Sequence, residues 1–198
     1  MKPIVLFDYG VGNLHSLHKA LSRRGDAVMI RQKLGGLEDA RALVLPGVGA
    51  FGAATEALGP ERATIRSAVD DGLPCLGICL GMQLLFESSE EGPGAGLGLV
   101  RGHVRRLDAG RCPQMGWNDV DTGADRLFDG AAGLIAYYAN SYVAAPALEE
   151  VVVARSTYMG DRFPAVVRSG RIVGIQFHPE KSGAAGLRIL DNFFDEIR

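Results

Sequence analysis

The feature that most constrains this chain is a segment that begins as a buried strand and turns sharply into a helix. It covers residues 73–87, and its apolar run 75–78 is followed by apolar residues at helical spacing. Cys79 stands at the junction, with Gly77 and Gly81 two residues away on either side. This G-x-C-x-G pattern is the thiol form of a nucleophile elbow. Such a turn forces its central residue into disfavoured backbone angles and needs glycine at both flanking positions.

Two interpretations of Cys79 compete at this point. A lone cysteine in an apolar run is most simply a buried structural residue. The paired glycines and the change from strand to helix favour the second interpretation, in which Cys79 is a catalytic nucleophile.

The first half of the chain alternates between strand-like and helix-like patterns. We expect strands at 4–7, 27–30, 42–45 and 75–78, and helices at 13–24, 53–58 and 62–70, with Asn13 as a helix N-cap. This alternation implies an α/β fold with a mostly parallel central sheet covered by helices on both faces.

The second half has a different character. Short strand-like runs at 102–107, 134–138, 151–154, 165–168 and 172–176 predict a more antiparallel half added to the same sheet. An amphipathic pattern over 183–197 predicts a closing helix. No linker divides the chain, so we expect a single domain over residues 1–198.

Composition excludes several classes of protein. A chain of 198 residues with 47% hydrophobic and 22% charged residues suits one well-filled core. Its net charge of −2 gives no argument for binding nucleic acid or a membrane surface. The N-terminus turns polar at Asp8, too early for a signal peptide or membrane span. Three cysteines, an odd number, indicate reduced thiols in the cytoplasm. No Cys/His set completes a metal site with Cys75 and Cys79, and we expect neither metal nor cofactor.

A thiol nucleophile needs a base and an acid that orients the base. His15 and His18 fit the solvated face of a helix, and His103 fits an exposed edge strand. His178 differs because it ends an apolar strand and precedes Pro179, which favours extended backbone. Glu180 would then project alongside the imidazole. The sequence therefore predicts Cys79, His178 and Glu180 as a catalytic triad.

Acyl transfer also needs hydrogen-bond donors for the developing oxyanion. The backbone N–H of Leu80, directly after the nucleophile, would be the first donor. The second would come from the loop after the third strand, at Val48 or Gly49. A glycine-rich turn without a catalytic role explains this loop equally well.

The chain resembles the class I, triad-type glutamine amidotransferases. The elbow at 77–83 and the late Gln-Phe-His-Pro-Glu stretch at 176–180 are the two signatures of that superfamily. The stretches at 8–14, 46–52, 114–118 and 178–182 narrow the resemblance to the glutaminase subunits of imidazole glycerol phosphate synthases.

The resemblance implies hydrolysis of L-glutamine to glutamate and ammonia through a thioester on Cys79, with His178 as base and Glu180 holding it. It also implies a set of glutamine-binding residues, namely Gln83, Glu87, Asn140, Ser141 and Tyr142. The family often has histidine at position 140, where this chain has asparagine.

The resemblance further implies a partner. In the family this is a (β/α)8-barrel cyclase that forms a heterodimer with the glutaminase and receives ammonia through an internal channel. The cyclase makes imidazole glycerol phosphate and aminoimidazole carboxamide ribonucleotide for histidine biosynthesis. The glutaminase motifs occupy the whole chain, which agrees with a separate acceptor subunit. Trp117, Asn118 and Lys181 match family positions at or near the interface. Without the resemblance, they would fit a half-buried aromatic anchor, a turn residue and a solvated cation.

Three alternatives remain open. The chain could serve another ammonia-channelling synthase, although Trp117-Asn118 and Lys181-Ser182 argue against it. It could be a dinucleotide-binding module, but His15 stands where that fingerprint needs glycine. It could also be a scaffold with a degenerate site, which the intact triad disfavours.

Overall fold

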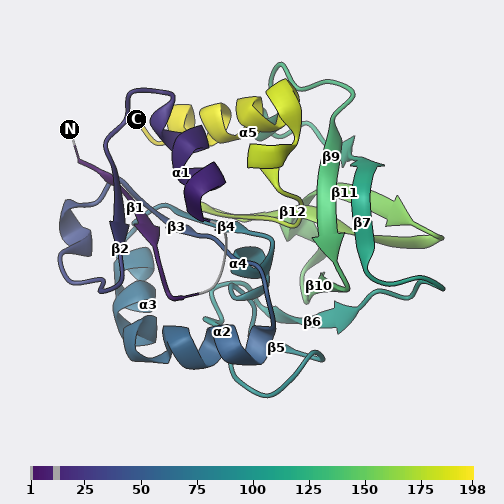
Figure 1. Ribbon diagram of the computed structural model, residues 1–198, viewed down its shortest axis with the longest axis horizontal. Helices are drawn as coiled ribbons and strands as arrows, with labels where there is room; N and C mark the ends of the chain where they lie inside the picture. Colours follow the sequence, from purple (N-terminus) through teal and green to yellow (C-terminus); the bar gives the residue numbers. More distant parts are fainter. Residues whose placement is uncertain (1, 11–13) are drawn as a thin grey trace.

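The computed structural model describes residues 2–10 and 14–198, and an eight-stranded sheet runs through its centre (Figure 1). Five neighbouring strands are parallel, in the order β2 (Val28–Arg31), β1 (Ile4–Phe7), β3 (Ala42–Leu45), β4 (Cys75–Ile78) and β13 (Ile172–Ile175). The antiparallel strands β12 (Asp161–Ser169), β11 (Val152–Tyr158) and β8 (Asp121–Thr122) extend this sheet. The α/β class and the mostly parallel sheet are therefore confirmed.

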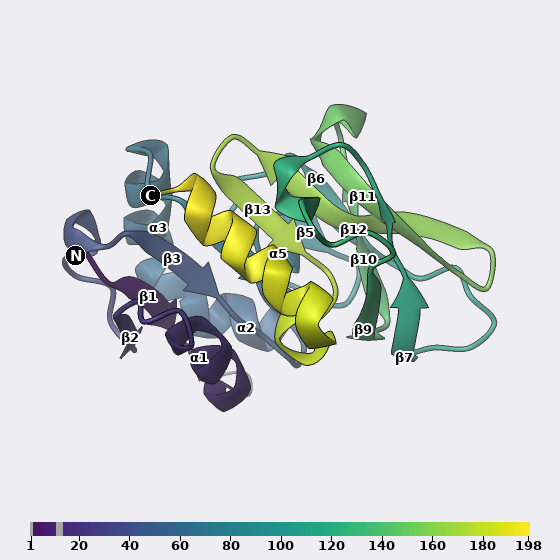
Figure 2. The ribbon, with the colours of Figure 1, turned by 90° about the horizontal axis from the view of Figure 1, so that it is seen from above.

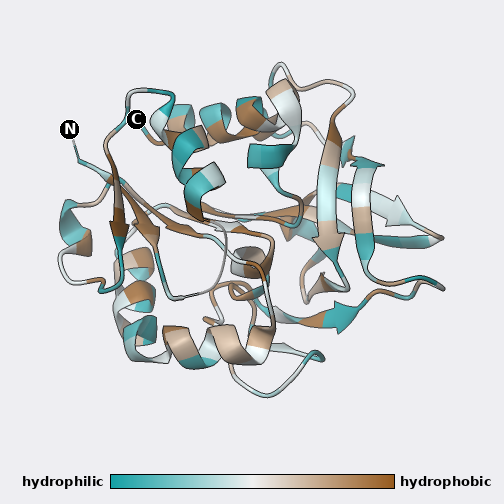
Figure 3. Cartoon of the chain, in the orientation of Figure 1, coloured by the Kyte–Doolittle hydropathy of each residue, from teal (hydrophilic) through white to brown (hydrophobic). Residues whose placement is uncertain are grey.

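Helices cover both faces of the sheet (Figures 1 and 2). One face carries α1 (Leu14–Ser22) and α5 (Gly183–Glu196), and the other carries α2 (Phe51–Leu58) and α3 (Arg62–Asp70). Each face has its own apolar cluster. Strands β1, β3 and β4 in the middle of the parallel part are buried on both sides, so they consist almost entirely of apolar residues (Figure 3). Within the described residues, no helix combines the length and apolar character needed to span a membrane.

Short 3₁₀ turns connect several of these elements. They are η1 (Leu37–Asp39), η2 (Gly59–Glu61), η3 (Arg126–Phe128), η4 (Glu149–Val151) and η5 (Pro179–Lys181). The first-half strand and helix predictions agree with the structure to within about two residues. The predicted N-cap Asn13 lies outside the described residues.

The prediction that all later strands join the central sheet was wrong. Strand β6 (Gly102–Arg106) is the middle strand of a separate sheet, between β10 (Tyr142–Pro146) and β5 (Ser88–Ser89). Among the described residues, strand β9 (Ile135–Asn140) pairs only with β7 (Gln114–Asp119), in an antiparallel ribbon. The sequence pattern had missed β7 and β10, which supply the partners that hold β6 and β9 away from the main sheet. His103 is exposed as expected, but it lies on a central strand.

The helix after the elbow is shorter than the pattern to residue 87 suggested. Helix α4 covers only Leu80–Gln83. Beyond it, the carbonyls of Leu84 and Leu85 accept hydrogen bonds from the backbone N–H groups of Leu97 and Leu99, at 2.7 and 2.8 Å. A returning loop therefore takes the acceptors that a longer helix would have used.

The elbow itself is confirmed. Cys79 has φ 53° and ψ −111°, a conformation that non-glycine residues rarely adopt. A Cβ added to Gly77 would lie 2.5 Å from the carbonyl oxygen of Gly81, and one added to Gly81 would overlap the carbonyl oxygen of Leu45. Both glycines are therefore required by contact with backbone atoms, which have little freedom to move.

Replacing Gly81 by alanine should destabilise the protein by about 3 kcal/mol or more, because the new methyl group must push β3 and α4 apart. Gly92→Ala is a suitable control, since a Cβ at Gly92 meets open space. The control should change the free energy of unfolding by only about 0.5 kcal/mol. Chemical denaturation of the two variants tests this, and equal effects would refute the packing argument.

Candidate active site

The candidate site lies where β4 and β13 end side by side. Ile78 and Ile175, the last residues of these parallel strands, are register partners. Cys79 and Gln176 therefore emerge as neighbours, and the backbone N–H of Cys79 donates to the carbonyl of Ile175 at 2.7 Å. His178 follows two residues later. The carboxyl ends of parallel strands are a common location for active sites in such sheets.

The structure brings the three predicted triad residues together. Glu180 Oε1 lies 2.9 Å from His178 Nδ1, and the side chains of both residues are about 95% buried. The backbone N–H of His178 donates to Tyr137 at 2.9 Å, and its carbonyl accepts from the Ser182 hydroxyl at 2.6 Å. Glu180 therefore holds the imidazole at Nδ1, and Tyr137 and Ser182 fix the backbone that carries the ring.

One detail of the triad prediction needs correction. His178 is extended, as expected of a residue before proline, but Pro179 opens the 3₁₀ turn η5. Glu180 thus reaches the imidazole from a turn, whereas the sequence argument had placed it on an extended strand. The predicted contact between the side chains of His178 and Glu180 still forms, because the turn folds Glu180 back towards His178.

The environment of His178 favours its charged form. Burial alone would lower the pKa of this imidazole, but interactions with Cys79 and Glu180 outweigh burial and raise the pKa to about 9. Nδ1 is committed to Glu180, whereas Nε2 is buried without a hydrogen-bond partner among the described residues. Nε2 is therefore the nitrogen that can exchange a proton with the Cys79 thiol or with a substrate.

A cavity of about 200 Å³ opens above Cys79. It is smaller than the roughly 300–1,000 Å³ typical of pockets for drug-sized ligands, so it suits a small metabolite. Seven predicted residues line it besides the nucleophile, and they come from three separate segments: Val48, Gly49, Leu80, Gln83, Asn140, Ser141 and Tyr142. The predicted nucleophile, oxyanion donors and most of the predicted glutamine-binding residues thus share one cavity.

Glu87 does not belong to this group. Its side chain is exposed and accepts a hydrogen bond from the backbone N–H of Gly102 at 2.9 Å. Glu91 lines the cavity in its place, and its Oε2 accepts from the backbone N–H of Phe51 at 2.7 Å. The short α4 explains this difference from the expected arrangement, because the chain turns after Phe86 and the later carboxylate, Glu91, lines the cavity.

Sequence reasoning also missed two buried residues beside Cys79. Tyr9 donates a hydrogen bond to the carbonyl of Pro46, and burial together with the nearby Cys79 raises the pKa of its phenol. Gln176 is fully buried, and its side-chain amide reaches Cys79 Sγ at 3.8 Å. Both residues stand inside the stretches that carried the family resemblance, and this was the signal that could have identified them.

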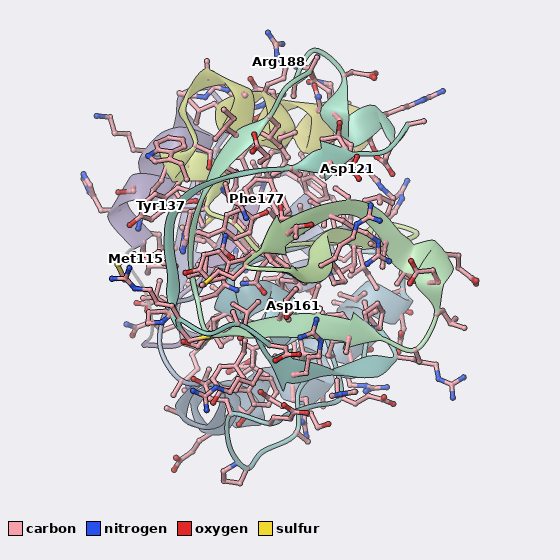
Figure 4. All side chains as sticks on the ribbon, turned by 90° about the vertical axis from the view of Figure 1, so that its right-hand side faces the viewer. Met115, Asp121, Tyr137, Asp161, Phe177 and Arg188 are labelled. Atoms are coloured by element: carbon pink, nitrogen blue, oxygen red, sulfur yellow. The ribbon has the colours of Figure 1, made fainter. Side chains whose placement is uncertain are left out.

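The outer face of the β7–β9 ribbon presents an exposed apolar patch made of Met115, Trp117, Ile135 and Tyr137. The first three are 68%, 60% and 50% exposed. The rings of Trp117 and Tyr137 meet edge to face, and Lys181 Nζ lies 5.8 Å from the centre of the Tyr137 ring. Figure 4 shows Met115 and Tyr137 along one edge of the molecule, with Phe177 nearer the interior.

Asn118 is not part of this patch. It alternates with Trp117 along β7 and so points to the opposite side of the ribbon. There its side-chain amide donates to the carbonyl of Thr157 at 3.0 Å. The structure thus brings Trp117 and Lys181 together but places the Asn118 side chain against β11.

Comparisons with known proteins agree with this geometry. The model of the family described as glutamine amidotransferase class-I matches residues 5–197. A solved structure described as a glutamine amidotransferase aligns with a TM-score of 0.78 and 25% identity, and covers 98% of this chain and 97% of its own. PurLQS from Thermotoga maritima aligns over the whole of both chains with a TM-score of 0.80, at 20% identity, which shows a shared fold.

Relatives found by sequence are more similar to this chain than these two solved structures are. The imidazole glycerol phosphate synthase subunit HisH of Halobacterium salinarum is 49% identical, with 97% of this chain and 92% of the relative aligned. The subunits of the same name from Geobacillus kaustophilus and Methanothermobacter thermautotrophicus are 47% and 46% identical, over 96% and 98% of this chain and 95% and 99% of their own. The chain therefore belongs to the class-I glutamine amidotransferase family and, within it, to the group of imidazole glycerol phosphate synthase HisH subunits.

Proposed function

We propose that this protein hydrolyses L-glutamine to glutamate and ammonia for an imidazole glycerol phosphate synthase, with Cys79, His178 and Glu180 as its catalytic triad. The observation that carries the proposal is the buried Cys79–His178–Glu180 arrangement beneath a cavity of about 200 Å³. The high identity to HisH subunits supports the same reaction.

In this mechanism the Cys79 thiolate attacks the carbonyl carbon of the glutamine side chain. His178, protonated at Nε2, gives its proton to the departing nitrogen as the C–N bond breaks, which leaves a thioester and releases ammonia. Water then attacks the thioester, passes a proton back to His178 and releases glutamate as the C–S bond breaks. Glu180 holds the imidazole in the orientation that both steps need.

The loop on the other side of the cavity would stabilise the oxyanion. Leu80 begins α4 directly after Cys79, and Val48 and Gly49 line the same cavity from the loop after β3. Backbone N–H groups from Leu80 and from Val48 or Gly49 would donate to the oxygen as it gains negative charge.

Glutamine recognition follows from the polar groups around the cavity. Glu91 is the carboxylate among the lining residues, so we assign it to the α-amino group of the substrate. Gln83, Asn140, Ser141 and Tyr142 would contact the remaining polar groups. The backbone groups of Ser141 and Tyr142 serve this purpose whatever side chain stands at position 140.

The released ammonia requires an acceptor, which we propose is a (β/α)8-barrel cyclase bound as a heterodimer. Trp117 and Lys181 would contact it through the exposed apolar patch, with Asn118 supporting the ribbon from behind. We place the protein in the cytoplasm, because Cys75, Cys79 and Cys112 are all free thiols, as is usual in a reducing compartment.

Cys79→Ala should abolish release of glutamate from glutamine in the reconstituted pair with the cyclase of the same organism. The same pair supplied with ammonium salt should still form imidazole glycerol phosphate, because the alanine variant removes only the nucleophile. Glutamate release and product formation are measured separately. Persistent glutamate release by Cys79→Ala would contradict the assignment of the nucleophile.

Glu91→Gln should raise the KM for glutamine about 10- to 100-fold, since it removes a charged partner of the substrate but keeps an acceptor for the Phe51 N–H. Glu87→Gln is the matched control and should leave KM close to its original value, because Glu87 faces Gly102. Steady-state kinetics on both variants decide between the two carboxylates. A KM effect confined to Glu87→Gln would restore the original prediction.

Trp117→Ala should weaken association with the cyclase about 30- to 1,000-fold, as expected for a central aromatic contact. Met159→Ala removes an equally exposed apolar side chain, 61% exposed, at the turn between β11 and β12, and should leave association unchanged. Titration calorimetry of each variant against the cyclase gives the comparison. Similar losses in both would argue against the exposed apolar patch as the interface.

A further inference from the structure

A chain of buried side-chain amides ends at the sulfur of Cys79, and the mechanism above gives it no role at that sulfur. Gln83 Nε2 donates to the carbonyl oxygen of Tyr142 at 3.0 Å and lies 3.3 Å from Gln176 Oε1. Gln176 Nε2 in turn lies 3.8 Å from Cys79 Sγ. Gln83 is 5% exposed and Gln176 is fully buried, so water has little access to these contacts.

The direction of this chain of hydrogen bonds is set by the backbone carbonyl of Tyr142. A backbone carbonyl only accepts hydrogen bonds, so the end of Gln83 that faces Tyr142 must be its NH₂ group. The atom of Gln176 that meets this NH₂ group must then be its carbonyl oxygen, because two NH₂ groups would repel each other. The opposite end of Gln176 is therefore its NH₂ group, and this end faces Cys79.

The backbone holds each member of the chain in place. Gln176 follows β13 directly, and its N–H donates to the carbonyl of Ala165 on β12 at 2.9 Å. Tyr142 is the first residue of β10, which pairs with β6. The Tyr142 carbonyl also accepts a hydrogen bond from Asn140 Nδ2 at 3.1 Å. The side-chain amides of Gln83 and Asn140 therefore both donate to this carbonyl.

We propose that Gln176 is a positioning residue for the nucleophile and that its NH₂ group donates to Cys79. The Tyr142 carbonyl fixes the orientation of the Gln83 amide, which in turn fixes the orientation of the Gln176 amide. A donor at this place favours the thiolate over the thiol, because it stabilises the negative charge on sulfur. It also stabilises the same sulfur when it leaves the thioester. The inference rests on the proposed role of Cys79 as nucleophile.

The chain of amides also limits which group of Gln83 can bind a ligand. Both hydrogens of its NH₂ group are committed, one to Tyr142 and one to Gln176. The group that remains for a ligand is the carbonyl oxygen of Gln83, which accepts hydrogen bonds. The substrate would therefore meet an acceptor here, suited to its carboxamide NH₂ group.

The test is the pH dependence of Cys79 alkylation by iodoacetamide in the free subunit, read by mass spectrometry that distinguishes Cys79 from Cys75. Gln176→Met should raise the pH at which the alkylation rate is half-maximal, the midpoint, by about one pH unit. Below the midpoint, the variant should be alkylated about tenfold more slowly than the wild type, as expected when a charged sulfur loses one donor. Gln114→Met is the matched control. It replaces another buried amide, 2% exposed, which has no hydrogen bond to Cys79 among the described residues, and it should leave the midpoint unchanged.

A second variant keeps the proposal testable if Gln176→Met fails to fold. Gln83→Met removes the group that orients Gln176 and should raise the midpoint by a smaller amount. The double variant Gln83→Met/Gln176→Met should shift it no further than Gln176→Met alone, because the two residues act in series. Additive shifts, or a Gln176→Met midpoint equal to that of Gln114→Met, would overturn the proposal.

The same titration separates this inference from the proposed function. Iodoacetamide reports the thiolate without requiring glutamine, so a shifted midpoint supports the role of Gln176 whatever the substrate is. A wild-type Cys79 that resists alkylation throughout the titration would instead contradict its assignment as nucleophile. If Cys79 is reactive but the midpoint is unchanged in both Gln176→Met and Gln83→Met, only the role of Gln176 is contradicted.

Discussion

The direct contact between the backbones of β3, β4 and α4 is the constraint on which the rest of the site depends. Gly77 meets the backbone of Gly81, and Gly81 meets the carbonyl of Leu45, with no room for a Cβ at either position. The chain can therefore leave β4 and enter α4 in a single residue. That residue, Cys79, takes a strained conformation with φ 53° and carries its sulfur to the end of the sheet.

Strand β13 completes the site because it lies beside β4 in parallel register. Gln176 and His178 leave the sheet at the same end as Cys79, so one pair of strands supplies the proposed nucleophile, the proposed base and the side-chain amide beside the sulfur. The separate β10–β6–β5 sheet and the β7–β9 ribbon then close the cavity, through Tyr142 and Asn140 respectively. The outer face of that ribbon carries the exposed apolar patch, so the proposed partner surface is built on the same element that lines the cavity.

The strands that could be predicted from the sequence share a physical property. Strands such as Ile4–Phe7 and Ala42–Leu45 are buried on both faces, so they appear as uninterrupted apolar runs. Strand β7 has alternating burial and contains an exposed Met115 and Trp117, which weakens the apolar signal. Glu91 could not be distinguished from Glu87 by pattern, because the choice depends on where α4 ends. That end is set by hydrogen bonds to residues 97–99, which lie more than ten positions further along the chain.

Local sequence patterns were enough to predict the elbow around Cys79, the His178–Glu180 pair and the family. Each of these rests on residues that are close together in the chain or on a residue type that only one conformation permits, such as glycine beside a strained turn. Three features became visible only in the folded chain: the carboxylate that faces the cavity, the exposed face of the ribbon and the amide that lies beside the sulfur. Those outcomes depend on contacts between segments as distant as Cys79 and Gln176, and such contacts exist only after the sheet has brought their strands into register.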